Sequence, residues 1–236
     1  MRGFEQLVIG ALLLVPAVLI AIPVHEMGHA VAAYFLGDRS VRYFGYFKPE
    51  PRRFLEPVGV ITVAVALVGW GRRVRIQPNR ISTTGQKVLY ELGGPAANLA
   101  VALVLGSILQ VLRRAGMPYS FDPGAGLFLA AVFVIVFLNL SLFAFNLLPI
   151  PGLDGWNIIE AIFKSRNARF FFNVSVRRRE IWAGCAIALV VFQFLLGINL
   201  LSVVMTPFYE PASLISLGEC DGYRIPGLVG LFPCLR

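Results

Sequence analysis

The sequence is poor in charged residues. Of its 236 residues, only 14% are charged and 57% are hydrophobic, and the mean hydropathy is +0.74. Soluble domains contain roughly 25% charged and 45–50% apolar residues. A soluble globule of this length could not bury so much apolar surface, so the composition excludes an ordinary cytosolic enzyme and a disordered chain. It predicts an integral membrane protein.

Cysteine and histidine are also scarce. The three cysteines are too few and too scattered for a disulfide framework or a cysteine-type zinc site. Histidine occurs only at His25 and His29, four residues apart. The net charge of +8 would suit a nucleic-acid-binding protein, but in a membrane protein Lys and Arg gather at the cytoplasmic surface. We therefore expect a lipid bilayer, and no nucleic acid, as the partner of the basic residues.

Four apolar runs are long enough to cross a bilayer as helices. They cover residues 7–37, 88–112, 126–150 and 181–205, and about 20 residues suffice for a span. A fifth run, 57–70, would be only about 21 Å long as a helix, which is too short.

The placement of Lys and Arg indicates what the short run does. If 57–70 crosses the membrane, the two sides carry 12 and 9 basic residues; if it enters and returns, they carry 16 and 5. The positive-inside rule favours the second arrangement. We therefore expect an all-α polytopic membrane protein with about four transmembrane helices, a re-entrant segment at 57–70, and both termini outside the cytoplasm. Re-entrant backbone is tolerated only beside protein or a water-filled cavity, so a polar cavity is expected in the bundle.

His25, Glu26 and His29 form an HExxH pattern within an apolar run. This spacing places both imidazoles on one helical face, where they can bind a single Zn²⁺ while the glutamate reaches the metal-bound water. The alternative is two polar side chains at a helix end near the lipid headgroups. Ionisable residues inside a membrane span favour the functional interpretation.

A catalytic zinc site needs a third protein ligand. Because there is no third histidine and the cysteines are remote, a carboxylate is expected, and Asp154 is the best candidate. It follows the run 126–150 in a stretch whose prolines and glycines break the helix. Runs 7–37 and 126–150 are predicted to cross in the same direction, so both end toward the cytoplasmic side, at the same depth.

Three motifs together resemble the site-2 protease family of intramembrane zinc metalloproteases. They are HEMGHA at 25–30, GGPAAN at 93–98 and FNLLPIPGLDG at 145–155, and the resemblance covers about 7–159. FKPEPRRFLEPVG at 47–59 and the Gly-Trp-Gly at 69–71 are similar to compact bacterial-type members. No segment resembles the PDZ or CBS modules of some relatives.

The resemblance implies an active site within the bilayer, toward its cytoplasmic side, that cuts transmembrane protein substrates. Carried over by motif, His25, His29 and Asp154 would bind one Zn²⁺ per chain. Glu26 would be the catalytic base, Asn146 would assist at the substrate carbonyl, and Asn98 would face the site. Glu91 departs from the pattern, where a small or apolar residue is expected. It would either line the cytoplasmic mouth of the site or be an ordinary carboxylate at a helix end.

Residues 72–77 partly alternate between polar and apolar, which is typical of an edge strand or hairpin. Such a strand could pair with an extended substrate, so Gly69, Gly71 and Val74 are predicted to bind substrate together with Asn98. A basic surface loop that contacts lipid headgroups explains the pattern equally well.

The sequence thus predicts a membrane-embedded metalloprotease domain over 1–205, with its catalytic core within about 7–159, and an extracytoplasmic tail over 206–236. Cys220 and Cys234 in this tail could form a disulfide or remain free. The expected function is an intramembrane zinc endopeptidase of a bacterial cell membrane that takes part in regulated intramembrane proteolysis. The alternative is a non-catalytic zinc-binding protein or transporter of the same fold.

Overall fold

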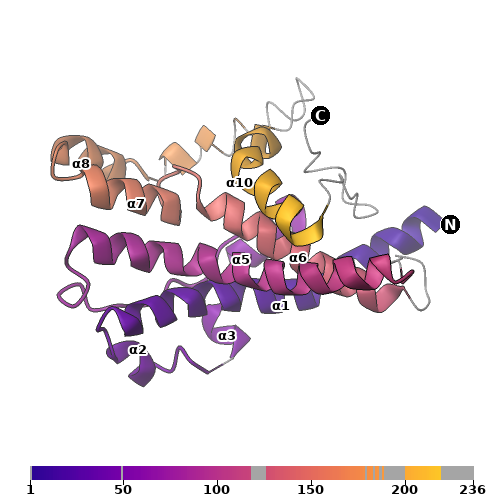
Figure 1. Ribbon diagram of the computed structural model, residues 1–236. Helices are drawn as coiled ribbons and strands as arrows, with labels where there is room; N and C mark the ends of the chain where they lie inside the picture. Colours follow the sequence, from indigo (N-terminus) through magenta and orange to yellow (C-terminus); the bar gives the residue numbers. More distant parts are fainter. Residues whose placement is uncertain are drawn as a thin grey trace.

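The computed structural model describes residues 2–48, 50–117, 126–178, 180–182, 184, 185, 188 and 200–218 (Figure 1). Within these residues all regular elements are helices and no β-sheet is present. The named helices are α1 (Arg2–Phe35), α2 (Ser40–Tyr43), α3 (Pro51–Phe54), α4 (Pro57–Ala66), α5 (Thr84–Arg114), α6 (Leu127–Asn146), α7 (Asp154–Phe163), α8 (Ala168–Val176) and α10 (Leu200–Leu217).

Among the described residues, four helices are long and apolar enough to cross a membrane, as many as the sequence predicts. They are Val8–Phe35 of α1, α5, α6 and α10. The fourth lies further along the chain than the predicted span of 181–205, most of which falls among residues that are not described. α10 continues past the predicted end at 205 and includes two prolines, Pro207 and Pro211. The domain boundary at 205 stays a prediction, and Cys220 and Cys234 lie outside the described residues.

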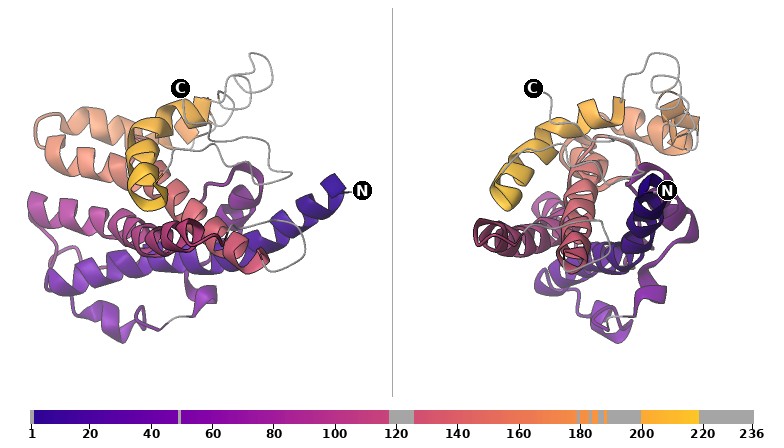
Figure 2. Two further views of the ribbon diagram at one scale, coloured as in Figure 1. Left: turned by 45° about the vertical axis from the view of Figure 1, so that its right-hand side comes forward. Right: turned by 90° about the vertical axis from the view of Figure 1, so that its right-hand side faces the viewer.

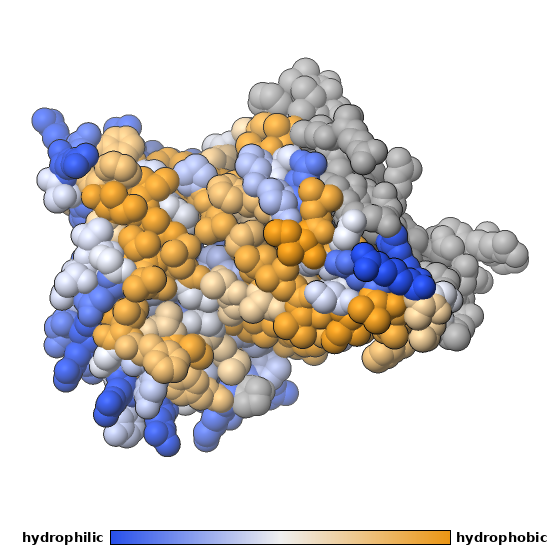
Figure 3. Space-filling model, viewed as in Figure 1, coloured by the Kyte–Doolittle hydropathy of each residue, from blue (hydrophilic) through white to orange (hydrophobic). Residues whose placement is uncertain are grey.

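Helices α1, α5 and α6 pack against one another and form the core of the molecule. α6 is the most enclosed, with 14 of its 20 residues buried, and Figure 2 shows it surrounded by α1, α5 and α10. α1 and α6 run in the same direction and α5 runs opposite to them (Figure 1). Apolar side chains cover the middle of the bundle, whereas hydrophilic ones gather at the end that carries α2 and α8 (Figure 3). This distribution is typical of a bundle that spans a bilayer.

α1 and α5 cross with their backbones in contact. A Cβ atom on Gly28 would meet the Cβ of Ala97 at 2.6 Å, and one on Gly93 would meet the carbonyl oxygen of Gly28 at 2.7 Å. Small residues allow such close approach between membrane helices. Gly28 lies between His25 and His29 in the sequence. The contact therefore holds the histidine-bearing part of α1 directly against α5.

The chain between α3 and α5 is irregular apart from α4, whose ten residues span only about 15 Å. Leu67 ends α4 in the left-handed conformation, with φ of 55°. The strand predicted over 72–77 is not formed: only an isolated antiparallel bridge joins Leu55 to Gly71. The reason is that no second strand lies beside this segment, and its N–H groups bond elsewhere. Those of Arg75 and Gln77 donate to Tyr46 Oη at 3.0 Å and to Asp38 Oδ2 at 2.7 Å.

Candidate metal centre

Three buried donor atoms form a nearly equilateral triangle at the polar end of the core. His25 Nε2 lies 3.2 Å from His29 Nε2 and 3.0 Å from Asp154 Oδ2, and the third side measures 3.2 Å. Donors bound to one tetrahedral zinc at 2.0–2.1 Å are about 3.3 Å apart. The triangle therefore matches one face of a zinc tetrahedron to within a few tenths of an ångström, and its three residues fit the metal that the sequence predicts.

Hydrogen bonds behind the imidazoles fix which ring nitrogen faces the triangle. His29 Nδ1 lies 2.8 Å from the carbonyl oxygen of Tyr90, which can only accept, so this nitrogen carries the proton. His25 Nδ1 lies 2.7 Å from Asn98 Oδ1 and donates to it in the same way. We infer that in the neutral rings both Nε2 atoms present lone pairs toward the same point, as metal-ligating histidines do.

The orientation of Asn98 is itself determined by its surroundings. Its Nδ2 donates to the carbonyl oxygen of Ala21 at 3.0 Å and to Asn139 Oδ1 at 2.8 Å, which leaves Oδ1 to accept from His25. Asn139 in turn donates to the carbonyl oxygen of Ile135 at 2.8 Å. Both asparagines are fully buried. The sequence predicted that Asn98 faces the site, but in the structure it lies behind His25 and contacts the imidazole.

The chain after α6 carries Asp154 to the histidines. Pro149 and Pro151 prevent α6 from continuing, and Gly152, with φ of +111°, turns the chain so that α7 begins at Asp154. The positive end of the α7 dipole favours a carboxylate there. Burial by itself would raise the pKa of Asp154, but the positive charge of the neighbouring imidazoles and their polar contacts with the carboxylate, first those of His29 and then those of His25, outweigh burial and hold that pKa well below its usual range. Asp154 is therefore ionised at neutral pH, as a ligand must be.

Glu26 lies beside the triangle with an oxygen that has no partner. The side chain is buried, and among the described residues Oε2 makes no hydrogen bond. Asp154 Oδ2 is likewise buried without one. Two buried carboxylate oxygens without hydrogen bonds are costly unless water or a cation satisfies them. Because Glu26 Oε2 is not part of the triangle, it gives a second indication that the centre binds a cation.

The centre opens into a cavity of about 750 Å³. The cavity is lined by His25, Glu26, His29, Trp70, Gly71, Arg73, Asn146, Gly152, Leu153, Asp154, Arg178 and Trp182. The rings of Trp70 and Trp182, 5.6 Å apart, form part of its wall. Asn146 is buried and donates from Nδ2 to the carbonyl oxygen of Leu142 at 2.9 Å, so its second N–H remains for another acceptor.

Of the four residues predicted to bind substrate, only Gly71 lines this cavity. Gly69 packs on α4, where a Cβ atom would meet Val63 Cγ2 at 2.5 Å. Val74 is 3% exposed and belongs to a second apolar cluster below α1. Asn98 lies behind His25, as described above.

The sequence prediction missed Arg73 and Asn139. Arg73 lines the cavity, but nothing in the sequence separates it from its basic neighbours Arg72 and Arg75. Asn139 could have been found, because an amide within an apolar run needs a hydrogen-bond partner inside the bundle. Tyr90 acts through its backbone carbonyl, which no residue pattern reveals.

Comparisons with known proteins agree with this geometry. Residues 13–193 match the family model described as "Peptidase family M50". The chain is 34% identical over 150 residues to "Putative zinc metalloprotease YwhC" of Bacillus subtilis, covering 62% of this chain and 67% of that protein. It is 36% identical over 148 residues to "Putative zinc metalloprotease Rip2" of Mycobacterium tuberculosis, covering 60% of this chain and 54% of Rip2. No solved structure matches the chain significantly.

The matches confirm the resemblance to the site-2 protease family that the three motifs predicted. They favour a zinc protease over a non-catalytic zinc-binding protein or transporter. The aligned regions span about two thirds of YwhC and about half of Rip2.

Proposed function

The chain belongs to peptidase family M50 and is a zinc metalloprotease of the membrane, and we propose that it hydrolyses peptide bonds in or near transmembrane segments of other membrane proteins. The observation that carries this proposal is the triangle of His25, His29 and Asp154 with the unpartnered Glu26 carboxylate beside it. The partners of the protein would be these transmembrane substrates, and the reaction would belong to regulated intramembrane proteolysis.

In this proposal His25, His29 and Asp154 hold one zinc ion per chain. When bound, zinc supplies Lewis acidity and lowers the pKa of water toward about 7. Glu26 accepts a proton from the attacking water as the new C–O bond forms, and passes it to the amine nitrogen as the C–N bond breaks. The free N–H of Asn146 donates to the substrate oxygen, on which negative charge develops.

We propose that Asn98 serves the reaction indirectly. It fixes the ring of His25 through the 2.7 Å hydrogen bond to Nδ1 and has no exposed surface with which to contact a substrate. Partners of this kind set the tautomer and direction of a metal-ligating histidine.

An extended substrate would pair with the chain at Gly71–Arg73. This choice is supported by the position of Gly71 and Arg73 at the cavity. Among the described residues the backbone groups of Arg73 have no hydrogen-bond partner, whereas those of Val74, Arg75 and Gln77 are already bonded to side chains. Strand addition would supply the partner that the Arg73 backbone lacks, since the Arg72 N–H already donates to the carbonyl oxygen of Phe54 at 2.7 Å. Under the alternative, its arginines contact lipid headgroups.

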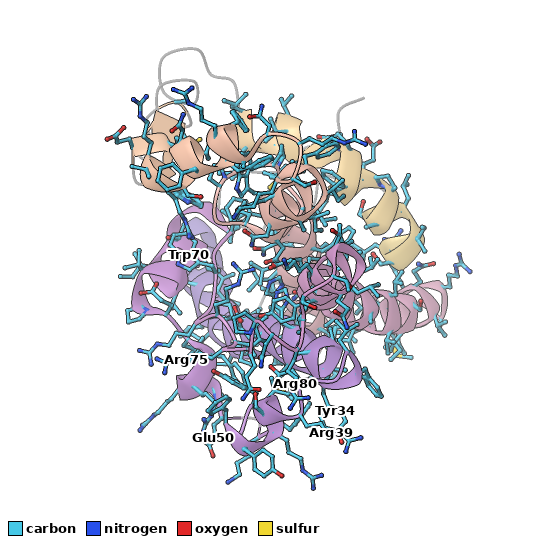
Figure 4. The ribbon with its side chains drawn as sticks, turned by 90° about the vertical axis from the view of Figure 1, so that its left-hand side faces the viewer. Tyr34, Arg39, Glu50, Trp70, Arg75 and Arg80 are labelled. Carbon is cyan, nitrogen blue, oxygen red and sulfur yellow. The ribbon has the colours of Figure 1, made fainter. Side chains whose placement is uncertain are left out.

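The proposed topology places the polar end in the cytoplasm of a bacterial cell and both termini outside it, with α4 as part of a re-entrant segment. The positive-inside rule supports this topology, because 16 of the 21 Lys and Arg residues fall on the proposed cytoplasmic side. Figure 4 views this end, where the labelled Arg39, Arg75 and Arg80 lie. α1 begins at the opposite end of the bundle (Figure 1).

The proposal is tested by Glu26→Gln in the purified protein with a single-pass membrane protein as candidate substrate. The substitution should leave zinc bound and lower cleavage at least about 100-fold, because general base catalysis is lost. Cleavage is followed by gel electrophoresis and zinc by elemental analysis. Glu50→Gln, at an exposed carboxylate that pairs with Arg53, serves as the control and should cleave normally. Undiminished cleavage by Glu26→Gln would contradict the proposed role.

A further inference from the structure

Behind Asp154 lies a group of polar side chains that the proposed reaction does not use. The Arg73 guanidinium forms an ion pair with Glu91 Oε2, and its Nη2 lies 3.7 Å from Asp154 Oδ1. Asn157 Nδ2 donates to the same Glu91 oxygen at 3.2 Å. These residues come from the loop before α5, from α5 and from α7, so the group joins three parts of the chain at one point.

The two oxygens of Asp154 therefore have different surroundings. Oδ2 faces the imidazoles, at 3.0 and 3.2 Å, and Oδ1 faces Arg73. A ligating carboxylate needs a second partner that fixes its plane, and loss of such a partner typically lowers metal affinity 10–100-fold. Arg73 is placed to be that partner, since it approaches the oxygen that the triangle does not use.

The position of Arg73 depends on Glu91. At 3.7 Å the guanidinium is too far from Oδ1 for a direct hydrogen bond, and Glu91 holds it there. The Glu91 side chain is largely buried, with 12% of its surface exposed, whereas 43% of the Arg73 side chain is exposed. Without Glu91, the uncompensated guanidinium would be free to approach Oδ2 and would add positive charge beside the metal.

Arg73 also borders two cavities. One is the catalytic cavity, and the other, of about 480 Å³, is lined by Glu91, Asn157, Lys87 and Lys164 among others. The Arg73–Glu91 pair lies where they adjoin. A released guanidinium would therefore have room to move on either side, so its position depends on the ion pair and not on packing.

We propose that Glu91 is a positioning residue, which through Arg73 orients the Asp154 carboxylate toward the metal and keeps the guanidinium away from Oδ2. This inference rests on the proposed zinc site. It assigns a role to Glu91, at a position where the family resemblance predicts a small or apolar residue.

The test is a double-mutant cycle of Glu91→Gln and Arg73→Gln with metal binding as the readout. Zinc affinity is measured by competition with a chromogenic chelator, and the visible absorption spectrum of the Co²⁺-loaded protein reports ligand geometry. Glu91→Gln should weaken zinc binding about 10-fold or more and shift the Co²⁺ spectrum. In the Arg73→Gln background the same change should alter affinity less than about 3-fold, because Glu91 acts only through Arg73.

Glu160→Gln is the matched control. Glu160 lines the second cavity and pairs with Lys164 at 2.8 Å, so its removal should change neither affinity nor spectrum. Unchanged zinc affinity in Glu91→Gln, or an equal loss with and without Arg73, would overturn the inference. If Glu91→Gln does not fold, Arg73→Gln alone still tests the inference: removal of the guanidinium should weaken zinc binding about 10-fold or more and shift the Co²⁺ spectrum, and unchanged binding would overturn it. Failure of the unsubstituted protein to bind zinc would instead contradict the proposed function.

Discussion

The metal centre and the loop beside it are held in place in different ways. At the centre, His25, Asn98 and Asn139 form a continuous chain of buried hydrogen bonds across α1, α5 and α6. In the loop that follows α4, isolated contacts such as those of Arg75 with Tyr46 and of Gln77 with Asp38 take the place of regular pairing. The helices thus fix the ligands to within a few tenths of an ångström, while the loop retains backbone groups that a substrate could use.

The two regions differ because different kinds of contact exclude other conformations in each. The ligands are fixed by backbone contact at Gly28 and Gly93, which admits no other crossing of α1 and α5. The loop is fixed by single side-chain hydrogen bonds, each worth only about 1 kcal/mol. We therefore expect small changes in the helices to abolish metal binding, and changes of equal size in the loop to impair catalysis alone.

Gly94→Ala should have the largest effect. A Cβ atom at Gly94 would lie against His29 Nε2 and 2.7 Å from His25 Nε2, in the space where the ligands converge. We expect zinc to be lost and cleavage to fall more than about 100-fold, since displacements near 1 Å have that effect. The measurements are zinc content and substrate cleavage.

Gly85→Ala, on the same helix, is the control for this change. A Cβ atom there meets nothing within 4 Å, so zinc and activity should be retained. A zinc-loaded, active Gly94→Ala protein would show that the ligand geometry described here is wrong.

Gly71→Ala should have a smaller and different effect. Its Cβ atom would lie 2.6 Å from Glu26 Oε1 and 2.9 Å from Ile22 Cγ2, and the three atoms nearest to it belong to these two residues, neither of which is a proposed metal ligand. We expect cleavage to fall about 10- to 100-fold with zinc content unchanged, because the catalytic carboxylate is displaced. Parallel zinc analysis and cleavage assays separate this outcome from that of Gly94→Ala. Loss of zinc in Gly71→Ala would remove the distinction between the two regions.

The local part of the site could be predicted from sequence. The spacing of His25 and His29 determines their common face on any helix, and the prolines and glycine before Asp154 signal the break that turns it inward. The prediction of four spanning helices followed from the lengths of the apolar runs and the placement of Lys and Arg, and the described residues contain four such helices. The catalytic roles of these residues stay predictions until the variants are made.

What sequence could not supply depends on contacts between distant segments. The family resemblance predicted that Asn98 faces the site, but the packing of three helices places it behind His25, to which it bonds. Val74 fits the alternation of a strand, yet no strand lies beside it in the part of the chain that the structure describes, and the residue packs in a small apolar cluster. Arg73 differs from the arginines around it through its contacts with two distant residues, Glu91, 18 positions away, and Asp154.

The central claim is that two imidazoles and one carboxylate of this chain bind zinc together. It is tested most directly by zinc K-edge X-ray absorption on the purified, zinc-loaded protein. The account predicts one zinc per chain, with a first shell of nitrogen and oxygen at about 2.0–2.1 Å, an imidazole signature from two histidines, and loss of the metal in Asp154→Asn. A sulfur shell at about 2.3 Å, or full zinc content in Asp154→Asn, would contradict it.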